Sequence, residues 1–121
     1  MPESIPVRRA DVDAVLSALA AGEHVDSTIL RQLVKATVEL LVARAPGRSV
    51  ELRIPPYAAA QVVPGVVHRR GTPPALVECD PATWLALAAG LLSWQQALAS
   101  PGLRASGERS DLSGFLPLIG E

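Results

Sequence analysis

Few side chains in this sequence have the chemistry of a catalytic nucleophile or a metal ligand. The one cysteine, Cys79, needs a neighbouring base to act as a thiolate nucleophile, but His24 and His68 lie far from it in the sequence. No His and Cys residues cluster at the spacing of a metal site. We therefore interpret Cys79 as a small packed residue of a strand, and we expect no metal, no other cofactor and no catalytic set.

The run His68-Arg69-Arg70 is the best polar candidate for a binding site. An arginine side chain presents a planar fork of donors that suits a carboxylate or a phosphate, so this run is a possible site for an anionic head group. The alternative is a solvated loop in which the arginines pair with nearby acidic side chains. The residues alone favour the loop and leave the head-group site as a hypothesis.

Charge and composition exclude several classes of protein. The 121 residues include 11 basic and 12 acidic ones, for a net charge of -1, and no dense basic run, so we expect no binding to nucleic acid. No apolar run approaches the roughly 18 residues of a membrane span, and the first residues do not resemble a signal peptide. Because a single cysteine suits a reducing compartment, we expect one soluble domain, residues 1–121, in the cytoplasm.

Hydrophobic residues at helical spacing predict two helices in the first part of the chain. The first begins near Asp11 and ends at Gly22. The second, residues 26–45, carries an apolar stripe over roughly half of its circumference, which must be covered from more than one side. We expect this helix to lie across a sheet, with Leu33 and Leu41 buried.

Capping signals predict two further, consecutive helices. Asp80 is a good N-cap, Pro81 suits the first helical position, and Gly90 is placed to close the helix. Ser93 begins the next helix and forms a capping box with Gln96. The two helices are therefore joined by a very short turn.

Runs of alternating or extended residues predict strands between these helices. They occupy residues 48–54, 57–63, 66–70, 75–79 and 103–106. The order of the elements indicates an α+β fold, with a mostly antiparallel sheet that helices cover on one face.

The segment from residue 77 to residue 94 is more apolar than a surface helix requires. It contains Trp84 and Trp94, and the whole chain has only two Trp, one Tyr and one Phe. Periodicity does not distinguish a packed core from the wall of a hollow. The residues alone favour the core.

A family resemblance favours the hollow. Residues 77–118 resemble the C-terminal half of the sterol carrier protein superfamily: a strand ending in Asp80, a helix closed by Gly90, a short helix, and a strand with small residues and Gly107 before a last helix. The runs at residues 45–59, 70–74 and 111–118 are similar to a compact actinobacterial branch of that family.

The resemblance implies a sheet of about five strands and an apolar tunnel between the sheet and the helices. It implies non-catalytic binding of a hydrophobic small molecule, such as a sterol, a fatty acid or an acyl-CoA. The family has no invariant polar residue that transfers to this chain, so the lining is predicted from the pattern of apolar residues. The predicted lipid-binding residues are Tyr57, Val62, Trp84, Leu87, Leu91, Trp94, Leu98 and Phe115.

Two other functions remain open at this point. Similar domains form the C-terminal part of mycothiol-dependent isomerases, so the chain can instead be a structural or interaction module with a filled core, acting in a homodimer or with an enzyme partner. An enzyme working alone on a small hydrophobic substrate is the least favoured, because no nucleophile and base are paired.

Overall fold

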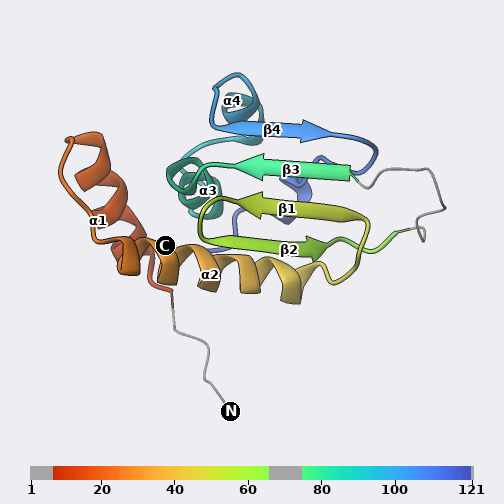
Figure 1. Cartoon of the computed structure of the whole chain (residues 1–121), viewed down its shortest axis with the longest axis horizontal. Helices are drawn as coiled ribbons and strands as arrows, with labels where there is room; N and C mark the ends of the chain where they lie inside the picture. The colour runs from red at the N-terminus through yellow and green to blue at the C-terminus, as the bar shows by residue number, and fades with distance from the viewer. Residues whose placement is uncertain (1–6, 66–74, 121) are drawn as a thin grey trace, which may run out of the picture.

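In the described part of the chain, two helices are followed by three strands, two further helices and a last strand, which is an α+β order (Figure 1). The computed structural model describes residues 7–65 and 75–120. Its elements are α1 (Arg9–Ala20), α2 (Ser27–Arg44), β1 (Val50–Ile54), β2 (Ala58–Val62), β3 (Ala75–Cys79), α3 (Pro81–Ala88), α4 (Trp94–Leu98), β4 (Leu103–Ser106) and a 3-10 turn, η1 (Ser113–Phe115).

The sheet differs from the prediction in strand number and in direction. The described residues form four strands in the order β2-β1-β3-β4, not about five, and the strand expected at residues 66–70 lies outside them. The sheet is mixed: the outer pairs are antiparallel, but β1 and β3 in the centre are parallel. The parallel pair arises because β3 pairs with the edge of β1 that β2 leaves free, and β3 runs in the same direction as β1.

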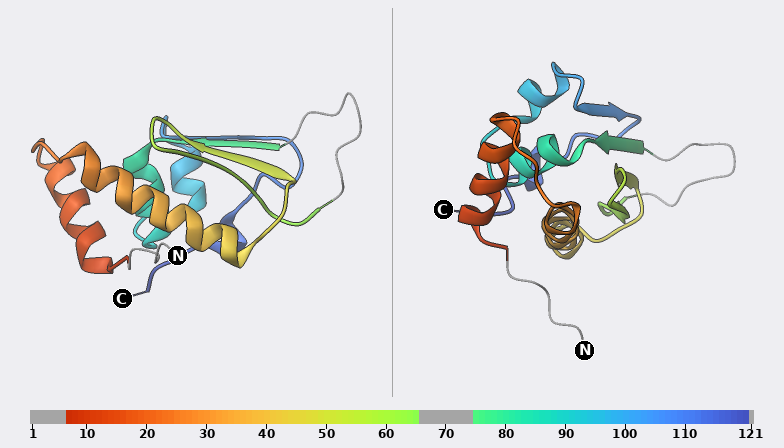
Figure 2. Two further views of the ribbon diagram at one scale, coloured as in Figure 1. Left: turned by 60° about the horizontal axis from the view of Figure 1, so that its bottom comes forward. Right: turned by 60° about the vertical axis from the view of Figure 1, so that its left-hand side comes forward.

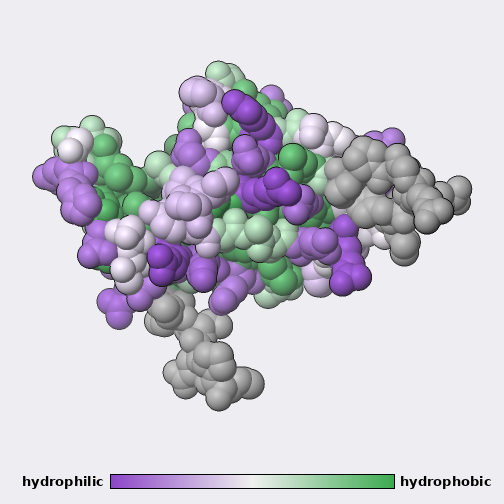
Figure 3. All heavy atoms as spheres, viewed as in Figure 1, coloured by the Kyte–Doolittle hydropathy of each residue, from purple (hydrophilic) through white to green (hydrophobic). Residues whose placement is uncertain are grey.

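In the described part of the chain, α2, α3 and α4 lie on one face of the sheet, as predicted, and α1 packs against α3 beyond the end of the strands (Figure 2). The strands alternate accordingly: Val50, Leu52 and Ile54 of β1 are buried, whereas Arg53 between them is exposed. Figure 3 looks onto the uncovered face, where hydrophilic residues lie across the sheet among weakly hydrophobic ones. On this face Arg53 and Glu51 form an ion pair at 3.2 Å.

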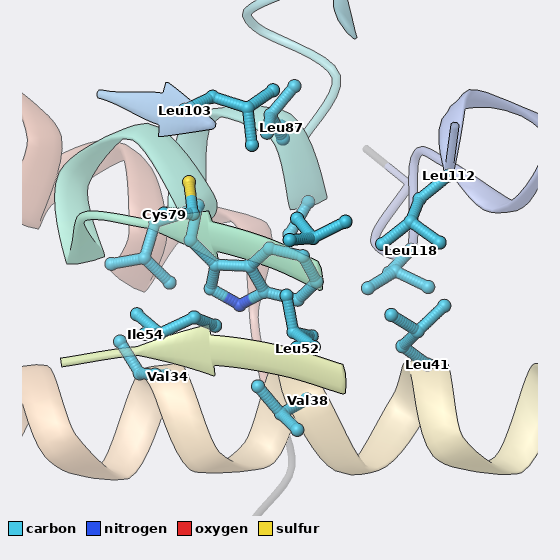
Figure 4. Packing of buried hydrophobic residues seen from close by; sticks show 14 of the residues in the cluster. Val34, Val38, Leu41, Leu52, Ile54, Cys79, Leu87, Leu103, Leu112 and Leu118 are labelled. Atoms are coloured by element: carbon cyan, nitrogen blue, oxygen red, sulfur yellow. The ribbon is translucent and has the colours of Figure 1, made fainter. Parts of the chain in front are cut away.

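The core lies between this sheet and α2. Figure 4 shows Val34, Val38 and Leu41 of α2 facing Leu52 and Ile54 of β1. The predicted burial of Leu33 and Leu41 is confirmed, since they are 7% and 0% exposed. The broad apolar stripe is covered on two sides, because α2 contacts both β2 and α3.

The local signals read from the sequence set the helix starts. The side chain of Asp80 accepts a hydrogen bond from the Thr83 amide at 2.8 Å. The capping box is complete: Ser93 Oγ accepts from the Gln96 amide, and Gln96 Oε1 accepts from the Ser93 amide. These short-range bonds fix where α3 and α4 begin and therefore how the chain turns between them.

Candidate functional site

A hollow of about 420 Å³ lies where the turn between α3 and α4 meets the segment that follows η1. Its wall includes Leu87, Leu91 and Trp94 from the helical side, and Leu116 and Pro117 from the other. The remaining lining residues are glycine, leucine, serine and glutamine, so none of the described residues that line it is charged. The volume falls within the range of about 300–1,000 Å³ that is usual for small-molecule sites.

The backbone of the turn brings the two walls together. Gly90 has a φ of 73°, a conformation that favours glycine, and it closes α3 as the sequence predicts. A Cβ atom at this position would lie 3.3 Å from Cβ of Pro117. The glycine therefore serves both the reversal of the chain and the close approach of the opposite wall.

Hydrogen bonds attach the second wall to the helices. Arg44, the last residue of α2, donates through Nη1 to the carbonyl oxygens of Phe115 and Pro117, at 2.8 and 2.7 Å. The amides of Leu118 and Ile119 both donate to the carbonyl oxygen of Ala88, at 2.8 and 3.0 Å. The wall is thus tied to the ends of two helices.

Three of the predicted lipid-binding residues, Leu87, Leu91 and Trp94, come together in this hollow. Two others have intermediate or high exposure: Leu98 is 39% exposed on α4, and Phe115 is partly buried and packs against the core. These two residues do not line the hollow.

The other predicted lipid-binding residues lie elsewhere in the fold. Val62 and Trp84 are 0% exposed in the core, and Tyr57 is partly buried after β1. The Trp84 Nε1–H group donates to Thr37 Oγ1 at 2.7 Å. The Thr37 hydroxyl is within hydrogen-bond distance of the Leu33 carbonyl, at 2.8 Å. The indole of Trp84 is therefore held as part of the core.

The head-group prediction is not tested by the structure, and some lining residues of the hollow were not predicted. The head-group candidates His68, Arg69 and Arg70 lie outside the described residues. Leu116, Pro117 and Ser113 line the hollow but were not predicted to do so. Their segment has no periodic pattern, and the only local signal there was the helical turn expected before Pro117.

A model of the family described as "Bacterial SCP ortholog" matches residues 26–118 of the chain. The chain belongs to this sterol carrier protein-like family. The match includes α2, all four strands and both walls of the hollow, and it confirms the family resemblance stated from the sequence. No curated protein matches the chain significantly.

Domains of this sterol carrier protein-like family are generally non-catalytic carriers, and the raised pKa of the Cys79 thiol agrees with that role. Burial raises the pKa of the Cys79 thiol from 9.0 to about 12, and the negative charge of Asp80 adds to the effect. The thiol is therefore protonated near neutral pH and is a poor nucleophile. Within the described residues no group of three or more His, Cys, Asp or Glu side chains is placed to hold a metal ion.

A second hollow, of about 240 Å³, lies beside the end of β3. Glu78, Asp80 and Arg104 are in its wall, together with Cys79. Three charged side chains in so small a space make it unsuited to an acyl chain or a sterol. The uncharged hollow at the turn between α3 and α4 is therefore the better candidate for a hydrophobic ligand.

In the part of the chain that the structure describes, every helix is too short or too polar to cross a bilayer.

Proposed function

We propose that this protein is a non-catalytic lipid carrier whose ligand occupies the hollow at the turn between α3 and α4. The observation that carries the proposal is the uncharged lining of this hollow in a member of a sterol carrier protein-like family. Its ligand is a fatty acid, an acyl-CoA or a sterol, with the apolar part inside. Because its one cysteine is a free thiol, we assign the carrier to the cytoplasm.

The expected affinity agrees with the lack of a polar recognition group. Burial of one methylene yields about 0.8 kcal/mol, so ten methylenes yield roughly 8 kcal/mol. Loss of translation and rotation opposes binding by at least about 4 kcal/mol. The difference, about 4 kcal/mol for ten methylenes, corresponds to weak binding with a dissociation constant of about 1 mM, which tolerates different head groups. Such binding suits a carrier that must also release its ligand.

Trp94 is the natural reporter of ligand binding, because it lines the hollow and is only 6% exposed. Addition of a long-chain fatty acid is expected to shift or quench tryptophan emission. The change should persist in Trp84→Phe, whose indole lies in the core, and disappear in Trp94→Phe. A fluorescence titration of the three proteins measures this.

The same titration can contradict the proposal. If emission stays unchanged at saturating fatty acid while an independent method shows binding, the ligand site is not this hollow. If the change follows Trp84 and not Trp94, the ligand enters between the sheet and the helices.

The second candidate function is a structural or interaction module with a filled core, used in a homodimer or beside an enzyme. The complete burial of Val62 and Trp84 favours it, because these positions were expected to line a tunnel. Native mass spectrometry of protein purified from cells separates the two functions. A bound acyl or sterol mass supports the carrier, whereas bare protein that takes up no added lipid supports the filled module.

A further inference from the structure

The hollow at the end of β3 has charged groups of both signs in its wall. Glu78 and Asp80 contribute carboxylates, and Arg104 contributes a guanidinium group. The rest of the lining is rigid or small: Pro55, Cys79, Pro101 and Gly102. None of these residues lines the larger hollow at the turn between α3 and α4. The two hollows are therefore separate, and their chemistry differs.

The ends of three strands bring these charges together. β1 and β3 are parallel, so their carboxyl ends lie at the same end of the sheet, and Asp80 directly follows β3 (Figure 1). β4 begins at this end, where Arg104 lies opposite Glu78. Both side chains belong to the uncovered face of the sheet, because their strand neighbours Cys79 and Leu103 are buried in the core.

The charged groups of the hollow are not used up by one another. Although Glu78 and Arg104 lie opposite each other, they form no ion pair in the part of the chain that the structure describes. Asp80 Oδ1 accepts the capping bond from the Thr83 amide. Asp80 Oδ2 lies against Gly102, where a Cβ atom would be 2.7 Å from it. Both signs of charge are thus available to a ligand.

We propose that this hollow binds a small zwitterion of the amino-acid class. The ammonium group of the ligand lies between the carboxylates of Glu78 and Asp80, and its carboxylate accepts hydrogen bonds from the guanidinium fork of Arg104. A ligand with a single charge leaves one sign of the wall without a partner. This second site does not depend on the proposed carrier function, because it shares no lining residue with the lipid site.

The volume and the charges restrict the class of ligand. The hollow of about 240 Å³ holds roughly eight non-hydrogen atoms, because one water molecule takes about 30 Å³ in the liquid. A short amino acid keeps within this limit, whereas a nucleotide exceeds it. The guanidinium group of Arg104 repels a metal ion, and no group of three or more metal-binding side chains is placed together among the described residues.

γ-Aminobutyrate is the probe that suits the arrangement of the charges. Neighbouring strands lie about 4.8 Å apart. The two charges of γ-aminobutyrate sit at opposite ends of a flexible chain, so they can reach Glu78 on β3 and Arg104 on β4 together. Butyrate and butylamine are matched controls, since each keeps one of the two charges.

An NMR titration of the full chain tests the proposal. With γ-aminobutyrate we expect saturable shifts of the amide signals of residues 78–80 and 102–104, and unchanged signals for residues 91–94 in the larger hollow. Butyrate and butylamine should bind at least about fivefold more weakly. Absence of saturable shifts at residues 78–80, or equal binding of either single-charge control, overturns the proposal.

Variants test the role of each charge. Arg104→Gln and Glu78→Gln each replace a charged group with an amide, and each should weaken γ-aminobutyrate at least about fivefold. Arg104→Gln should also bind butylamine as well as γ-aminobutyrate, because the partner of the carboxylate is gone. Arg31→Gln and Glu39→Gln, at exposed positions of α2, should leave binding unchanged. Equal losses in the α2 variants would contradict binding in this hollow.

Asp80→Asn tests the third charge while the helix start is kept. Asparagine caps a helix about as well as aspartate, so α3 should begin at the same residue and urea unfolding should be little changed. We expect weaker binding of γ-aminobutyrate in this variant, and unweakened binding contradicts the role of Asp80. Displacement of γ-aminobutyrate by a fatty acid would place both ligands in one hollow and would overturn the separate site.

Discussion

At the scale of single residues, the two tryptophans have different roles although both follow the same sequence pattern. Each starts or lies in a short helix and is followed by small and branched side chains. Trp84 points its N–H group to Thr37, a contact between residues far apart in sequence, whereas Trp94 lines the hollow. The sequence around each tryptophan does not show where Thr37 lies in the fold. The sequence alone therefore could not show that Trp84 is in the core and that Trp94 lines the hollow.

The hydrogen bond from Trp84 gives a prediction about stability. In Thr37→Val the shape of the side chain is kept, but the buried indole N–H loses its acceptor. We expect the free energy of unfolding to fall by about 1–3 kcal/mol. Thr37→Ser, which keeps the hydroxyl, should lose clearly less. Urea unfolding of both variants measures the difference, and a loss in Thr37→Ser that equals or exceeds the loss in Thr37→Val would contradict a dominant role of the hydroxyl.

At the scale of elements, periodicity and caps predicted most of the secondary structure. The starts of α3 and α4 follow from Asp80 and Ser93, and the predicted strands at residues 75–79 and 103–106 agree with β3 and β4. These signals act over a few residues and are visible in the sequence. The sheet is mixed and not only antiparallel, and the parallel pairing of β1 with β3 was not predicted, because strand pairing depends on which edge is reached and not on local propensity.

The buried apolar face of α2 gives a prediction about the stability of the fold. Leu33 is 7% exposed and faces the core, whereas Leu40 is 41% exposed. Leu33→Ala should lower the free energy of unfolding by about 2–5 kcal/mol. Leu40→Ala, the same change on the same helix, should cost less than about 1 kcal/mol. Comparable losses in denaturant unfolding would mean that the buried face of α2 is assigned wrongly.

At the scale of the whole molecule, the hollow is built from two parts of the chain that sequence analysis treats separately. Leu87, Leu91 and Trp94 were predicted because their spacing on short helices is regular. Leu116 and Pro117 were not, because their place depends on the hydrogen bonds that Arg44 donates and on those that the Ala88 carbonyl accepts. Predicting them requires knowing that the end of α2 lies beside the end of α3.

The bonds of Arg44 give a prediction about the second wall. Arg44→Met keeps much of the side-chain length but removes both bonds to the carbonyl oxygens. The segment should open more often, and amide hydrogen exchange at Leu118 and Ile119 should accelerate about five- to tenfold. Arg31→Met, a change at an exposed arginine of the same helix, should leave these rates unchanged. Unaltered exchange in Arg44→Met would show that the Ala88 contacts alone hold the wall.

The parallel pairing of β1 with β3 also orders the assembly of the fold in time. The β1–β2 hairpin is closed by a short local loop, so its entropic cost is small. The pair β1–β3 joins residues such as Val50 and Ala75, and β4 joins only after α3 and α4 have been synthesised. On the ribosome, therefore, one edge of β1 stays unpaired until β3 has emerged. Nascent chains that end before β3 leave the backbone groups of this edge unpaired, an arrangement that favours aggregation.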